Sequence, residues 1–75
     1  MARMSNAERE FREEFPYTRV EIEQSHFGKR YRVFAGDYLC DESYGRELAF
    51  NRSLLYVRSG YITPDPNERS TTHAK

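Results

Sequence analysis

The feature that most constrains the fold is a pair of alternating segments separated by turn residues. Residues 18–24 place Val20 and Ile22 on one face and charged side chains on the other, and residues 29–35 alternate in the same way. A period of two is typical of half-buried strands. Between the two segments, Ser25 to Gly28 has the composition of a turn. The sequence therefore predicts an antiparallel β-hairpin.

The length of the predicted turn also decides which residues face each other across the hairpin. A four-residue turn pairs apolar side chains on the inner face: Ile22 with Tyr31, and Val20 with Val33. It pairs opposite charges on the outer face: Glu23 with Arg30, and Glu21 with Arg32. Such charge pairs stabilise a ladder by about 0.2–1 kcal/mol each. Both arginines thus have predicted partners inside the hairpin, and Tyr31 belongs to the core face.

The second half of the hairpin, GKRYRVF at residues 28–34, interleaves cations with aromatic side chains, as many nucleic-acid-binding surfaces do. Such a surface would use Arg19, Lys29, Arg30 and Arg32. However, twelve Lys and Arg balance twelve Asp and Glu, so the chain lacks the basic excess typical of nucleic-acid binders. The segment also departs from the residue order of RNA-recognition sheets. A nucleic-acid-binding module is therefore the alternative function and not the leading one.

Before the hairpin, the sequence predicts a short amphipathic helix of about residues 6 to 15. Ser5 and Glu8 have the spacing of a capping box, in which two side chains satisfy unpaired backbone donors. Pro16 disfavours helical geometry at the residue before it and ends the helix. Apolar residues recur at spacings of three and four on one face: Met4, Ala7, Phe11 and Phe15.

After the hairpin, the sequence predicts an acidic loop over residues 36–43 and then a second helix. Asp41 or Ser43 can cap this helix, which runs to about Arg58 and stops at Gly60. A helical projection gives two apolar clusters: Tyr44, Leu48 and Leu55, and Phe50, Leu54 and Val57. A polar wedge lies between the clusters: Glu47, Asn51 and Arg58.

Residues 53–63 admit an alternative, in which the helix ends near Arg52 and one or two short strands follow. The last stretch, residues 64–75, is almost devoid of apolar side chains and predicts a disordered tail. The predicted fold class is α+β, in the order helix, antiparallel hairpin, second helix, with both helices on the inner face of the hairpin. Residues 1–63 form a single small domain in this prediction.

Residues that could carry out chemistry are few and isolated. Cys40 stands beside Asp41, and a nearby carboxylate raises a thiol pKa, which is the opposite of what a nucleophile needs. The acidic loop matches neither a zinc nor a calcium pattern, and no serine lies in a nucleophile elbow. We therefore expect no enzymatic activity, no metal and no cofactor.

The chain is rich in tyrosine and arginine for its size, and these residues anchor many protein interfaces. The leading hypothesis is a small non-catalytic regulator that binds a larger protein and inhibits it. The candidate contact residues are exposed aromatic and arginine side chains: Phe27, Phe34, Tyr38, Arg52, Tyr56 and Arg58.

The short, motif-free chain with mixed charge resembles, in character, accessory proteins of phages and mobile elements. That resemblance implies host machinery as the target, with transcription or nucleic-acid processing as the class of process. A lone cysteine excludes an intramolecular disulfide, and no apolar run suits a signal peptide or membrane span. We therefore expect a cytoplasmic protein without a membrane partner, either a monomer or a weak homo-oligomer.

Overall fold

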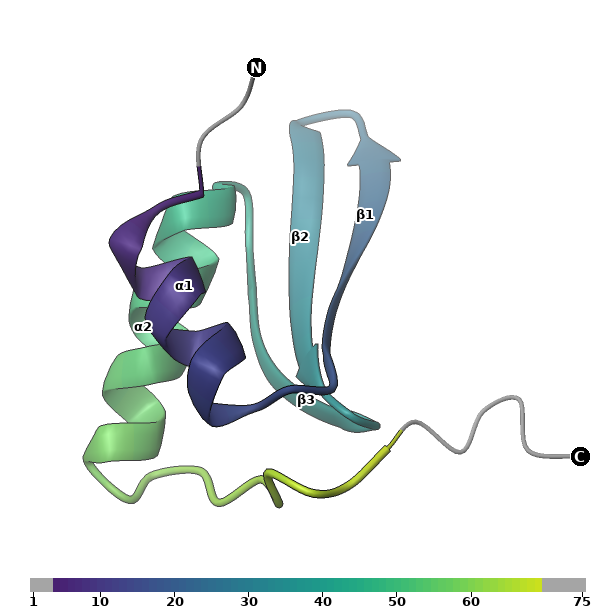
Figure 1. Ribbon diagram of the computed structural model, residues 1–75. Helices are drawn as coiled ribbons and strands as arrows, with labels where there is room; N and C mark the ends of the chain where they lie inside the picture. Colours follow the sequence, from purple (N-terminus) through teal and green to yellow (C-terminus); the bar gives the residue numbers. More distant parts are fainter. Residues whose placement is uncertain (1–3, 70–75) are drawn as a thin grey trace, which may run out of the picture.

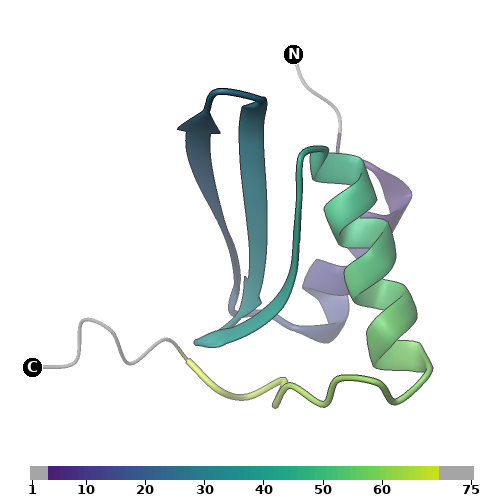
Figure 2. The same cartoon turned by 180° about the vertical axis from the view of Figure 1, so that it is seen from behind.

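The computed structural model describes residues 4–69 of the 75-residue chain and confirms the α+β class (Figure 1). The described residues form two helices and a three-stranded antiparallel sheet in the order β1-β2-β3. Both helices lie on one side of the sheet, and α2 runs beside β3 (Figure 2). The elements follow in chain order: α1 (Asn6–Glu14), β1 (Thr18–Ser25), β2 (Gly28–Ala35), β3 (Tyr38–Ser43) and α2 (Arg46–Arg58).

The register of the hairpin is as predicted, with Ile22 opposite Tyr31 and Glu21 opposite Arg32. The turn is tighter than expected, because Ser25 and Gly28 still pair as strand residues. The Ser25 hydroxyl holds this turn together, since its Oγ donates to the Gly28 carbonyl at 2.8 Å and accepts from the Phe27 N–H at 3.2 Å. The hairpin end is therefore closed by side-chain as well as backbone hydrogen bonds.

The prediction of an acidic loop over residues 36–43 is wrong, because Tyr38–Ser43 forms the third strand, β3. Val33 faces Asp41 and Phe34 faces Leu39, so Cys40 is an extra residue in a β-bulge. The bulge interrupts the alternation by which a strand is recognised in a sequence. The third strand thus lies before the second helix, whereas the sequence analysis considered further strands only as an alternative for residues 53–63.

The predicted start of the second helix is also wrong. Asp41 and Ser43 lie in β3, and α2 begins at Arg46 after Gly45, which provides no capping side chain. The helix continues to Arg58, which contradicts the alternative of a strand at residues 53–58. Between α2 and residue 69, the described chain contains no further strand.

The first helix begins at Asn6 as predicted and ends at Glu14, one residue before the predicted end. The Ser5 Oγ accepts a hydrogen bond from the Glu8 N–H at 3.1 Å, and Phe11 and Phe15 are buried. The Glu8 carboxylate does not complete the capping box; it accepts hydrogen bonds from Arg12 and from Arg46 of α2 instead. Glu8 therefore connects the two helices.

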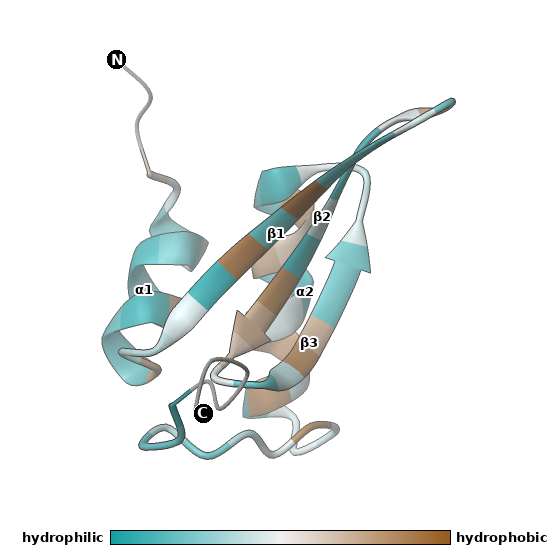
Figure 3. Cartoon of the chain, turned by 90° about the vertical axis from the view of Figure 1, so that its right-hand side faces the viewer, coloured by the Kyte–Doolittle hydropathy of each residue, from teal (hydrophilic) through white to brown (hydrophobic). Residues whose placement is uncertain are grey.

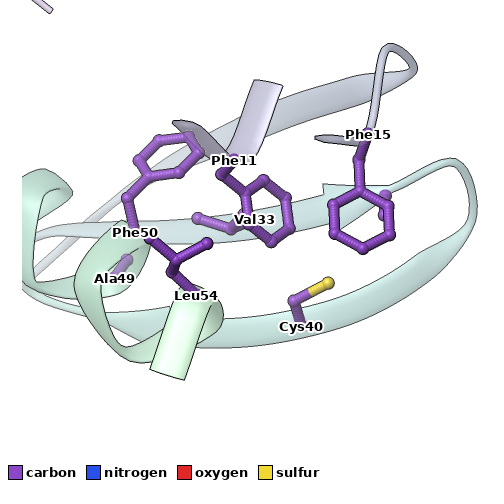
Figure 4. Close-up of a cluster of buried hydrophobic side chains, with 8 residues drawn as sticks. Phe11, Phe15, Val33, Cys40, Ala49, Phe50 and Leu54 are labelled. Atoms are coloured by element: carbon purple, nitrogen blue, oxygen red, sulfur yellow. The ribbon is translucent and has the colours of Figure 1, made fainter. Parts of the chain in front are cut away.

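The core lies between α1, α2 and the base of the sheet (Figure 4). Phe11 of α1 and Phe15, just after its end, both enter the core, and Phe11 lies edge-on to Phe50 with ring centroids 5.8 Å apart. The predicted core face of the hairpin extends further than the helices do, so Ile22 is exposed, contrary to the prediction. The buried cluster comprises Phe11, Phe15, Val33, Ala35, Cys40, Ala49, Phe50 and Leu54.

Residues 62–69 return from α2 along the base of the sheet (Figure 1). Pro64 is buried, and the Thr63 N–H donates to the Tyr38 hydroxyl at 3.4 Å. The Arg69 Nε donates to the Tyr17 hydroxyl at 3.2 Å. The predicted disordered tail, residues 64–75, overlaps this segment at residues 64–69, and residues 70–75 lie outside the described residues.

Candidate interaction surface

The outer face of the sheet carries a network of charged side chains. Arg32 contacts Glu23 at 2.7 Å and Glu42 at 2.8 Å, and Arg30 contacts the same Glu42 carboxylate at 2.7 Å. Arg19 pairs with Glu21 and lies 3.8 Å from Asp37. Although the strand register is as predicted, neither predicted ion pair, Glu23 with Arg30 or Glu21 with Arg32, is formed. Glu23 binds Arg32, Glu21 binds Arg19, and Glu42 of β3 binds both arginines of β2.

Three of the four residues of the predicted nucleic-acid surface thus have carboxylate partners. The hydrogen bonds that Arg32 donates to Glu42 and then to Glu23 raise its pKa further above its usual value. Lys29 is exposed near the end of the hairpin. A phosphate would have to compete with the sheet's own acids for the arginines Arg19, Arg30 and Arg32.

Two of the predicted protein-binding aromatics are covered by the protein itself. The Phe34 ring lies under the Arg19 guanidinium, 4.2 Å from its centroid, and Phe34 is half-buried. Tyr38 is half-buried against the core, with its hydroxyl bonded to the backbone of Thr63. Both rings are therefore already engaged in contacts within the protein.

The other predicted contact residues lie in the C-terminal half of α2 but not on one face: Arg52 and Tyr56 are neighbours, whereas Arg58 is turned about 120° from Arg52 around the helix. The Arg52 Nε donates to the Tyr56 hydroxyl at 3.3 Å, and the same guanidinium lies 3.4 Å from Asp41. The Tyr56 ring stacks at an angle on Tyr61, with centroids 5.2 Å apart. Arg58 pairs at 3.0 Å with Glu10 of α1, and both side chains are exposed.

The sequence analysis grouped Tyr44, Leu48 and Leu55 as an apolar cluster but did not predict that this stripe on and before α2 is exposed. Leu48 is 50% exposed, Leu55 is 62% exposed, and Tyr44, just before the helix, is 53% exposed. Ser53 is fully buried, and Leu55 is turned about 200° from it around the helix, toward solvent. The signal in the sequence is a helix with apolar residues on every side, which is typical of helices that are covered all round.

The sixth predicted contact residue, Phe27, is the most exposed of the large apolar side chains described, at 83%. It lies at the end of the hairpin, where residues 23–30 run past the last residue of β3, Ser43, which pairs with Tyr31. Figure 3 shows this end extending away from the helices. We call residues 23–30 the hairpin arm.

Ion pairs and hydrogen bonds hold the hairpin arm in place, although β3 does not extend beside it. Arg30 reaches back to Glu42 of β3, and Glu23 contacts Arg32. At the tip, the hydrogen bonds of Ser25 fix the turn that carries Phe27. A two-stranded ribbon by itself is marginally stable, so these contacts determine how well the tip keeps its shape.

No protein-family model, curated protein or solved structure matches this chain. Within residues 4–69, no group of three acidic, histidine or cysteine side chains is arranged to hold a metal ion. None of the helices in this part of the chain has the length and apolar character needed to cross a bilayer. Burial raises the pKa of the Cys40 thiol to about 11, with a smaller contribution from Asp41.

Proposed function

We propose that this protein is a small non-catalytic regulator that binds a larger protein and inhibits it by inserting the hairpin arm. The observation that carries the proposal is the position of Phe27, exposed at the tip of an arm that is fixed by hydrogen bonds and ion pairs. An exposed aromatic ring on a fixed support loses little conformational freedom when it enters a pocket. The arm therefore suits a contact that blocks a site on the partner.

The surroundings of Phe27 support a protein partner. Ile22 is half-exposed on the inner side of the hairpin, and His26 and Lys29 are exposed beside the tip. A central apolar anchor with a polar rim is the usual composition of a protein-binding hot spot. We place the protein in the cytoplasm, where a lone buried thiol such as Cys40 stays reduced.

The experiment is a capture of partners from a lysate of the source cells on immobilised protein, with and without nuclease treatment. We expect a discrete protein band that survives nuclease and is lost with the variant Phe27→Ser. The matched control is Leu39→Ser, which removes an exposed apolar side chain from the outer face of the sheet. With the partner identified, Phe27→Ser should weaken binding at least about tenfold.

The same capture distinguishes the alternative function. A band that depends on nucleic acid, or retained nucleic acid without protein, would favour the basic residues of the hairpin over Phe27. Equal capture by the wild type and by Phe27→Ser would contradict the arm as the binding element.

A further inference from the structure

The exposed side of α2 has the residue spacing of a helix that packs along a second helix. Leu48, Asn51, Leu55 and Arg58 are all exposed and follow one another at intervals of three, four and three residues. This is the spacing of the a and d positions of a coiled coil. Tyr44 lies before α2, where Gly45 is extended, and its ring contacts Arg30 of the sheet. We call the four α2 residues the α2 seam.

We propose that a second copy of this chain packs antiparallel on the α2 seam, related by a two-fold axis beside Asn51. Leu48 and Leu55 lie on either side of Asn51, so such an axis places Leu48 of each copy against Leu55 of the other. It places the two Asn51 side chains next to each other, where one amide can donate to the other. A polar residue at such a position fixes the register of paired helices.

Two charged side chains complement each other in this arrangement: Glu47, which lies beside the seam, and Arg58, at the end of the seam. Glu47 and Arg58 are eleven residues apart, which puts them within about 20° of each other on the same flank of α2. A two-fold axis perpendicular to both helices brings each flank against the same flank of the second copy. Glu47 of one copy then lies within about 3 Å, along the helix axis, of the level of Arg58 of the other. Glu47 of each copy can then join the pair that Arg58 of the other copy makes with its own Glu10 at 3.0 Å, once on each side of the axis.

The remaining charges do not oppose the pairing. Arg52 lies on the other flank near its counterpart, and each guanidinium keeps its own Asp41 at 3.4 Å. The chain has a formal net charge of zero, so two copies do not repel each other as highly charged proteins do. Antiparallel helices also align their dipoles favourably. The complementarity of apolar residues and charges therefore favours a second copy as the occupant.

The test is sedimentation velocity of the full chain over a concentration series up to about 1 mM. We expect the mass to rise from the 8.9 kDa of one chain toward twice that value. The double variant Leu48→Glu/Leu55→Glu should stay monomeric, whereas Leu39→Glu, with similar exposure on the sheet, should associate like the wild type. Circular dichroism confirms that each variant is folded.

A charge exchange tests the antiparallel arrangement. Glu47→Arg should weaken association at least about threefold, and Glu47→Arg/Arg58→Glu should restore it, because opposite charges again face each other across the axis. A wild type that stays monomeric throughout the series, or a double leucine variant that associates normally, would overturn the proposal. Failure of the exchange to restore association would overturn the antiparallel register. Phe27 is not part of the seam, so capture of a partner by the arm is tested independently.

Discussion

At the scale of single residues, Glu8 is the carboxylate that holds the two helices together. Its side chain is buried, and it accepts hydrogen bonds from Arg46 at 2.9 and 3.1 Å and from Arg12 at 3.0 Å. The hydrogen bond from Arg46 is the largest of the causes that lower its pKa, and it outweighs the opposing effect of burial. The folded state therefore prefers ionised Glu8 more strongly than the unfolded state does.

We expect Glu8→Gln to lower the free energy of unfolding at neutral pH by about 2 kcal/mol, which is typical of hydrogen bonds to charged groups. Because the pKa of Glu8 is lower in the folded state, its stabilisation is present above the unfolded value of 4.5. It disappears as the pH falls through the folded pKa. Urea denaturation over a pH series should show the gap between wild type and variant closing in acid.

The matched control for this prediction is Glu10→Gln, which removes the exposed partner of Arg58. A surface pair of this kind contributes at most about 1 kcal/mol. The result would contradict an ionic link through Glu8 if both variants lost the same free energy of unfolding. It would also do so if the difference between the wild type and Glu8→Gln did not decrease in acid.

Asp41 should show the opposite dependence on pH. Burial is the main cause that raises its pKa, and its Oδ2 has no hydrogen-bond partner within the described residues. Its folded pKa lies above the unfolded value of 3.8, so its contribution to stability is lost as the pH rises through the folded pKa. Arg52 is partly exposed and can return to water if Asp41 is neutral.

We therefore expect Asp41→Asn to be as stable as the wild type at neutral pH, or more stable by up to about 1 kcal/mol. The same urea titrations measure this difference, and the two proteins should converge in acid, where Asp41 is protonated. A loss of more than about 1 kcal/mol at neutral pH would mean that the contact with Arg52 outweighs the cost of burial.

At the scale of elements, the hairpin could be predicted from sequence and the third strand could not. The alternation around Val20 and Val33 specifies both strands and their register, since a slip by one residue would expose the apolar face. In β3, the bulge at Cys40 breaks the alternation, and the acidic residues of DES are unfavourable in strands. Without β3, the partners of the arginines could not be predicted, because Glu42 comes from that strand.

The candidate contacts divide in the same way. Phe27 could be predicted to be exposed because turns lie at the surface. The exposure of Leu48 and Leu55 on α2 could not be predicted, because the sequence of a helix that is apolar on several sides does not show which side the core covers. Packing decides this: Ala49 and Phe50 face the core, and Leu48 and Leu55 are left outside.

The turn between β2 and β3 makes a close contact with the C-terminal segment. Gly36 has φ +63°, and a Cβ atom there would lie 2.5 Å from the Glu68 carbonyl oxygen. We expect Gly36→Ala to destabilise the fold by about 2–3 kcal/mol, from backbone strain and the clash together.

The control variant Gly60→Ala distinguishes the backbone strain in Gly36→Ala from its clash with Glu68. Its φ is also positive, at +79°, but a Cβ atom there would meet nothing within 4 Å. Gly60→Ala should therefore cost about 1 kcal/mol, from backbone strain alone. Thermal unfolding compares the two variants, and equal losses would mean that the contact between Gly36 and Glu68 does not contribute.

At the scale of the whole molecule, the sign and placement of the charges favour the protein-binding regulator over the nucleic-acid-binding module. The outer face of the sheet carries arginines that could bind phosphates, yet each has a carboxylate partner within the same network. Phosphate binding gains its free energy from released counterions, which a neutralised face does not supply. We therefore expect the wild type not to shift a duplex RNA or DNA of about 20 base pairs in a mobility assay at low salt.

Neutralising the glutamates of the outer face should create a basic surface that binds nucleic acid. In the variant Glu21→Gln/Glu23→Gln/Glu42→Gln, Arg30 and Arg32 lose their carboxylate partners, and Arg19 loses that of Glu21. This variant should bind duplex nucleic acid, with a slope of log affinity against log salt of about −2 to −3 for three phosphate contacts. Binding by the wild type with a similar slope would establish the nucleic-acid alternative. If neither protein binds, the shape of the sheet and not its charge excludes the duplex.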